Sequence, residues 1–186
     1  LLLVISFPLG AFLYFSADDI IVVVFGSQWM AAVPVFQILS ISLPLQMVLS
    51  TTGSIYQAAN QTRWLFYTGL INTAITVVGF ILAAIFFRDI QAMAWAWDIT
   101  LLINALDSFS ILYLLVLKQS LRPLLQSFGY PALSAFIISV LLFLVDKLEL
   151  AFVLDGVVNL LISFALLLVS LQLTKVYDIK KLILEV

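Results

Sequence analysis

Long apolar runs, separated only by short polar segments, are the feature that most limits how this chain can fold. Its 186 residues include 8 lysines and arginines and 10 aspartates and glutamates, and 65% of them are hydrophobic. A soluble domain has about a quarter of its residues charged, because its surface must face water. So few charged side chains cannot cover the surface of a soluble domain, and we expect lipid to be the main solvent.

Six apolar segments predict an all-α fold, a polytopic bundle of about six transmembrane helices in a single domain. A spanning helix needs roughly 20 mostly apolar residues. The predicted helices cover about residues 1–25, 29–59, 64–87, 92–117, 131–145 and 156–174. We expect the first to break near residues 16–19 and the second to kink at Pro34 and Pro44. The fifth is expected to start at Pro131.

Basic residues in the loops indicate how the bundle is oriented. With six spans, the larger basic group lies on one side and comprises Arg63, Lys118, Arg122, Lys175, Lys180 and Lys181. Only Arg88 and Lys147 fall on the other side. The positive-inside rule places the larger group, and with it the C-terminus, in the cytoplasm.

Large amides within the predicted spans are candidates for lining a substrate or ion cavity. They are Gln37, Gln46 and Gln57 in the second segment, Asn72 in the third and Asn104 in the fourth. Serine, threonine and glycine on the same helix faces have a simpler interpretation, since small and hydroxyl residues let membrane helices pack closely. Close approach explains the larger amides less well, so cavity lining and packing both stay open for them.

Two aspartates in the fourth predicted helix are the costliest residues in the bundle. An ionised Asp at the bilayer centre costs at least roughly 2.5–3.5 kcal/mol. Asp107 shares a helix face with Asn104 and Ser108, which predicts a cation site, a proton site or a contact to a substrate hydroxyl. The alternative is a neutral Asp107 that is hydrogen bonded to a neighbouring helix. Asp98 lies half a turn out of phase with Asp107, and it can instead reach the outer headgroup region.

Other classes of site find little support in the sequence. Arg63 is either a contact to a lipid phosphate or a positive-inside anchor. The chain has no Cys and no His, which removes thiol and imidazole chemistry and the usual zinc ligands. It carries no Gly-rich phosphate loop, and its net charge of −2 does not suit nucleic acid. We therefore expect no enzyme activity, no cofactor, no metal and no nucleic-acid partner.

Several short motifs resemble a known family of exporters. They are Phe7-Pro8-Leu9-Gly10, the turn Phe25-Gly26-Ser27-Gln28-Trp29, and a long helix ending in Gly53-Ser54-Ile55-Tyr56-Gln57-Ala58-Ala59-Asn60-Gln61-Thr62-Arg63. Over residues 7–117 the chain resembles the polysaccharide transporters, or lipid-linked oligosaccharide flippases, of the MATE-like multidrug/oligosaccharidyl-lipid/polysaccharide exporter superfamily. The family usually has a glycine at the entry to the fourth segment, where this chain has Ile90-Gln91-Ala92-Met93-Ala94.

The resemblance implies the C-terminal half of a transporter with 12–14 helices, and a start within an apolar run at Leu1 fits an N-terminal bundle missing from this chain. It implies export of undecaprenyl-pyrophosphate-linked glycans by alternating access across the bacterial inner membrane, with membrane lipids as further partners. One alternative is a cation-coupled multidrug or small-metabolite exporter of the same superfamily. Another is a structural membrane protein that does not transport and uses its polar residues only for helix packing.

Overall fold

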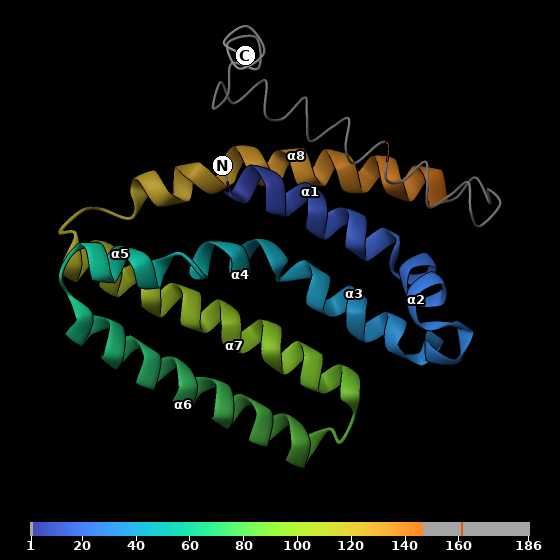
Figure 1. The fold of residues 1–186 in the computed structure, drawn as a ribbon, viewed down its shortest axis with the longest axis horizontal. Helices are drawn as coiled ribbons and strands as arrows, with labels where there is room; N and C mark the ends of the chain where they lie inside the picture. The colour runs from blue at the N-terminus through green and yellow to red at the C-terminus, as the bar shows by residue number, and fades with distance from the viewer. Residues whose placement is uncertain (1, 147–160, 162–186) are drawn as a thin grey trace, which may run out of the picture. The chain divides into compact units, whose positions relative to one another are not determined.

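The computed structural model describes residues 2–146 and residue 161, and the elements in that part of the chain are all helical (Figure 1). The expected all-α membrane fold is confirmed to that extent. Apart from residue 161, the helix expected at 156–174 lies outside the described residues, as do Lys147 and the three C-terminal lysines. The chain divides into two compact units, Leu1–Val33 with Phe128–Val186, and Pro34–Ser127.

The first unit contains a sharply broken helix. α1 (Leu2–Phe15) and α2 (Ala17–Phe25) meet at Ser16 with a bend of 73°, within the expected region of residues 16–19. A short 3₁₀ helix, η1 (Ser27–Ala32), follows Gly26. Gly26 has φ +92°, and a Cβ there would lie 2.7 Å from the Gln28 side-chain oxygen. This backbone conformation explains why the turn between Phe25 and Trp29 needs glycine.

Helix α8 (Arg122–Asp146) corrects one expectation. The sequence places its start at Pro131, but the helix begins at Arg122 and Pro131 lies inside it. Proline has no N–H, so one carbonyl a turn earlier loses its helical partner there. Membrane helices tolerate this loss when nearby groups satisfy the freed carbonyl. Pro131 is therefore an interior residue of α8, and the apolar stretch Pro131–Leu144 is only part of that helix.

The helix expected over residues 29–59 is divided into shorter pieces in the second unit. They are α3 (Val33–Ile41), α4 (Leu43–Leu49) and α5 (Thr52–Ala58). The pieces on either side of Ser42 are bent by 49°. Pro34 and Pro44 each lie at the second residue of a helix, where a missing N–H costs no hydrogen bond. The chain therefore breaks before Pro44 instead of kinking a continuous helix.

Two long helices complete the second unit. α6 (Thr62–Phe86) is followed by α7 (Ile90–Ser110), which continues as a π-helix, η2 (Ile111–Val116). α6 and the α7–η2 helix are each long and apolar enough to cross a membrane, and up to 4 such spans exist if each bent pair counts as one. The described residues thus supply two to four of the six expected spans.

The turns at the ends of these helices contain non-glycine residues with positive φ angles. Asn60, Arg88 and Lys118 have φ of 55°, 53° and 51°, in the left-handed region. These residues terminate the helices before α6, α7 and α8, a position that glycine most often takes. As a result, α6 and α7 form a tight antiparallel hairpin with the Arg88–Asp89 turn at one end (Figure 1).

Candidate functional site

The facing sides of α6 and α7 carry a connected set of polar side chains. The Asn72 side-chain N–H group donates a hydrogen bond to the Ser108 hydroxyl over 2.9 Å. The Asn104 amide donates to the Thr76 hydroxyl over 3.0 Å and to the backbone carbonyl of Asn72 over 3.4 Å. Residues four apart lie on one face of a helix, so each helix presents one pair to the other. The sequence-based cluster of Asn104 and Ser108 therefore includes Asn72.

A tyrosine from α5 extends this set. The Tyr56 hydroxyl donates to the backbone carbonyl of Ser108 over 3.2 Å, and its side chain is only 1% exposed. The sequence analysis missed Tyr56 as a site residue. The available signal was a tyrosine on the polar second segment, since a buried phenol needs a hydrogen-bond partner.

We call Tyr56, Asn72, Thr76, Asn104 and Ser108, together with the adjacent Asp107, the polar cluster. Its unusual property is a surplus of acceptors. The side-chain oxygens of Asn72 and Asn104 and one carboxylate oxygen of Asp107 are buried, and none has a hydrogen-bond partner among the described residues. Unpaired buried acceptors cost free energy, and they are satisfied by groups that donate, such as hydroxyls, or by a cation. The cluster can therefore accept hydrogen bonds from a ligand that carries donor groups.

Asp98 occupies a second, separate position, on the side of α7 that packs against α4. Both of its carboxylate oxygens are buried without a hydrogen-bond partner in the described part of the chain. It interacts with Ser42, but the Ser42 hydroxyl donates to the Leu39 carbonyl over 3.0 Å and accepts from the Gln46 amide over 2.9 Å. These oxygens thus lie beside the α3–α4 break.

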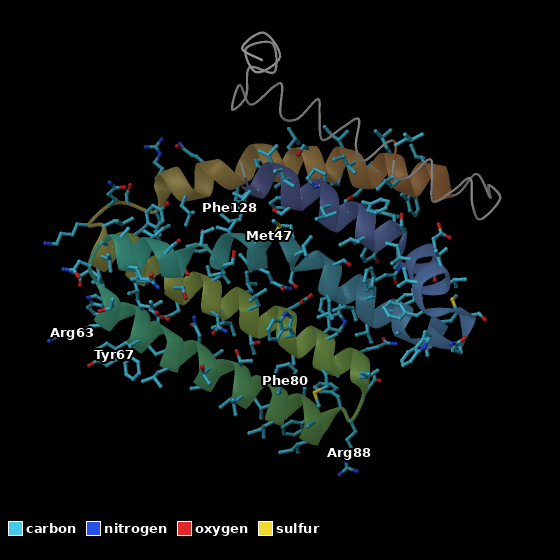
Figure 2. The ribbon with its side chains drawn as sticks, in the orientation of Figure 1. Met47, Arg63, Tyr67, Phe80, Arg88 and Phe128 are labelled. Carbon is cyan, nitrogen blue, oxygen red and sulfur yellow. The ribbon has the colours of Figure 1, made fainter. Side chains whose placement is uncertain are left out.

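The remaining candidates lie at separate places along α3 to α6. Gln46 is engaged with Ser42, Gln37 is half-buried on α3, and Gln57 is exposed near the end of α5. Arg63 is exposed at the start of α6, and Figure 2 shows it at the opposite end of that helix from Arg88. This position is compatible with both interpretations of Arg63, the contact to a lipid phosphate and the positive-inside anchor.

Comparison with known proteins gives one informative match. No protein-family model matches the chain, and no solved structure matches it significantly. The chain is 29% identical over 166 residues to the teichuronic acid biosynthesis protein TuaB of Bacillus subtilis (strain 168). The match covers 89% of this chain and 34% of that protein, so the chain spans about a third of the length of the relative it matches.

Proposed function

We propose that this chain is part of a bacterial membrane exporter for polysaccharide or its lipid-linked repeat units, acting in the synthesis of cell-surface polysaccharide. The observation that carries the proposal is the surplus of buried acceptors at the polar cluster, midway along two apolar helices. The similarity to a teichuronic acid biosynthesis protein supports the glycan as the transported material. In this proposal the lipid is an undecaprenyl pyrophosphate in the inner membrane, and the C-terminus is cytoplasmic.

The chemistry of the cluster suits a sugar. A hydroxyl taken from water into an apolar environment without a hydrogen bond costs roughly 1–3 kcal/mol in proteins. Each sugar hydroxyl can donate one hydrogen bond, and the oxygens of Asn72, Asn104 and Asp107 accept it. The cluster therefore lowers the barrier that the bilayer core presents to a glycan. Alternating access would expose these acceptors first to one side of the membrane and then to the other, together with a further bundle of the same chain.

A second candidate function is cation-coupled export of a drug or small metabolite, and Asp98 favours it. A carboxylate whose two oxygens find no donor among the described residues is expensive to keep ionised in a membrane helix. Binding of a proton or a monovalent cation removes that cost. On this alternative Asp98 would carry the coupling ion beside the α3–α4 break, and export would respond to the ion gradient.

Complementation of glycan export tests the leading proposal. The full chain is expressed in a bacterium that lacks its own exporter, and surface polysaccharide is measured with Asn104→Leu, Asp107→Ala and Ser110→Ala. We expect Asn104→Leu and Asp107→Ala to lower surface glycan about tenfold at unchanged protein level, the effect of one lost buried hydrogen bond. Within residues 2–146, the Ser110 hydroxyl donates to the Leu106 carbonyl of its own helix, so Ser110→Ala is the matched control.

The outcomes separate the candidates. Wild-type surface glycan in both Asn104→Leu and Asp107→Ala would contradict a role for the polar cluster in glycan export. A different result would favour the second candidate. In that case no glycan is exported, but vesicles containing the protein transport a small solute in exchange for a cation, and Asp98→Asn abolishes this transport. Absence of transport in both assays supports a structural role.

A further inference from the structure

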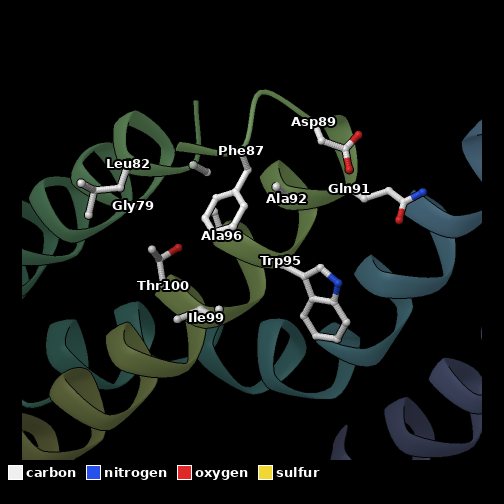
Figure 3. Close-up of a pocket in the computed structure, with 11 residues that line it drawn as sticks. Gly79, Leu82, Phe87, Asp89, Gln91, Ala92, Trp95, Ala96, Ile99 and Thr100 are labelled. Atoms are coloured by element: carbon white, nitrogen blue, oxygen red, sulfur yellow. The ribbon is translucent and has the colours of Figure 1, made fainter. Parts of the chain in front are cut away.

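A cavity alongside the contact between α6 and α7 is lined by the second half of α6 and the first half of α7, and it lies wholly within one compact unit (Figure 3). Its volume is about 440 Å³, within the range of sites that hold small molecules or lipid chains. Leu82 and Ala83 line it from α6, and Ala92, Ala96 and Ile99 line it from α7. The interior is therefore apolar and suits a hydrocarbon chain.

One end of the cavity is polar. Asp89 and Gln91 line it where the chain turns from α6 into α7, away from Ile99 and Thr100 (Figure 3). Asp89 is the N-cap residue of α7, but its side chain makes no capping hydrogen bond. Aspartate at this position normally accepts a bond from its own helix. Its exposed carboxylate is thus left available at the cavity mouth.

The neighbouring charge completes a zwitterionic pattern. Arg88 directly precedes Asp89 and is exposed, and its side chain extends away from the helices (Figure 2). The mouth therefore presents an anion beside the cavity, with a cation next to it at the turn. A phospholipid with an amine headgroup carries both complementary groups, an ammonium for the Asp89 carboxylate and a phosphate for the neighbouring Arg88. A primary ammonium has three N–H donors for a carboxylate and an amide oxygen, whereas a quaternary one has none.

The place of the cavity argues for a lipid over a soluble amphiphile. Both of its walls are helices that can cross a membrane, and the Arg88–Asp89 turn joins their ends at the depth of the headgroups. Trp95 lines the cavity, and indole rings favour this interface. We propose that the cavity binds an amine-bearing phospholipid, with one acyl chain between α6 and α7 and its ammonium at Asp89.

Native mass spectrometry of the full chain tests this lipid site. The protein in mild detergent is offered equal amounts of phosphatidylethanolamine, phosphatidylcholine and phosphatidylglycerol with identical acyl chains. We expect retention of phosphatidylethanolamine about fivefold or more above the other two, since charge-assisted hydrogen bonds are the stronger class. Asp89→Asn should bring its retention close to that of phosphatidylcholine, and Asp18→Asn, an exposed acid on α2, should leave the preference unchanged.

A second pair of variants tests the acyl chain. Ala92→Trp fills the cavity and should remove most of the retained lipid, while Ala84→Trp, at an exposed position of α6 that does not line the cavity, should not. If Ala92→Trp fails to fold, Asp89→Asn in the exposed turn still decides the headgroup assignment. Equal retention of all three lipids by the wild type, a preference for phosphatidylglycerol, or an unchanged preference in Asp89→Asn would each overturn the proposal.

Discussion

α6 and α7 are adjacent helices of similar length, yet they have very different surroundings. In the most apolar stretch of α6, 6% of the residues are buried, and in that of the α7–η2 helix 33% are buried. α6 packs mainly on α7 and also contacts α5, while α7 packs on α6 and on α4. Both aspartates of the pair, Asp98 and Asp107, lie on α7. The acids are thus carried by the helix with neighbours on two sides, where a polar group can be kept from lipid.

The polar face of α6 follows the same logic. Asn72 and Thr76 bond to α7, and Gly79 meets it at Thr100, while large apolar residues such as Val78 and Phe86 are exposed. α6 is therefore an edge helix of this unit with a single protein-facing stripe. α7 is an inner helix with two such faces. Substitutions on the exposed face of α6 should therefore change stability less than substitutions where α6 and α7 meet.

The largest effect is expected where the two helices touch. A Cβ at Gly79 would overlap the Thr100 methyl group. Turning the Thr100 side chain about its Cα–Cβ bond to make room would break the hydrogen bond from its hydroxyl to the Trp97 carbonyl. Gly79→Ala should therefore lower the free energy of unfolding by about 1–3 kcal/mol. Denaturation of the purified protein, followed by tryptophan fluorescence, measures this.

Gly69→Ala is the matched control on the same helix. Nothing lies within 4 Å of a Cβ at Gly69, so the better helix propensity of alanine should raise stability by roughly 0.5–1 kcal/mol. Equal effects of the two substitutions would show that α6 and α7 do not approach closely at Gly79.

The next effect concerns the bonds across the hairpin. Asn104→Leu removes the donor to Thr76 and Asn72 and should lower stability by about 0.6–1.7 kcal/mol, the range for hydrogen bonds between membrane helices. A double-mutant cycle with Thr76→Val isolates the pairwise coupling between the two helices. Strictly additive losses would indicate that Asn104 and Thr76 do not bond.

A smaller loss is expected for the contact from α5. Tyr56→Phe removes the bond to the Ser108 carbonyl but keeps the buried ring, and should lower stability by about 0.6 kcal/mol. Tyr67 is 55% exposed on α6, and Tyr67→Phe should change stability little. If the exposed tyrosine proved the more sensitive one, α6 would not be the edge helix.

The smallest effect is expected on the outer face of α6. Val78 is 54% exposed, so Val78→Ala should change the free energy of unfolding by less than about 0.5 kcal/mol. The same unfolding assay applies. A loss well above this value in the full chain would show that another segment covers the outer face of α6.

The fold class and the straight helices follow from hydropathy because a spanning helix needs little beyond length and apolar composition. α6 and α7 accordingly begin within two residues of the expected positions. Hydropathy does not report neighbours, so α6 and α7 look equivalent in sequence and differ only once α4 packs against one of them. For the same reason the sequence could not show that Pro131 lies inside α8.

The candidate site was partly predictable for a similar reason. The periodicity of a helix places Asn104 and Ser108 on one face, and polar residues in a membrane tend to pair with polar residues of a neighbour, which brings in Asn72. Tyr56 could not be assigned in this way, because its partner is a backbone carbonyl that any residue could supply. The surroundings of Asp98 depend on the break at Ser42, which fixes where α4 meets α7. The functional roles of these residues stay predictions.

The π-helix η2 has a mechanical consequence for the end of the hairpin. In this geometry each N–H bonds to the fifth carbonyl before it, as the Leu117 N–H does to Leu112, so Ile111–Val116 holds more residues per turn than an α-helix. Tightening it to α geometry by one residue would rotate the following segment by about 100° around the helix axis. The register of the helix between Ser108 and the Lys118 turn therefore sets the direction in which the chain leaves α7.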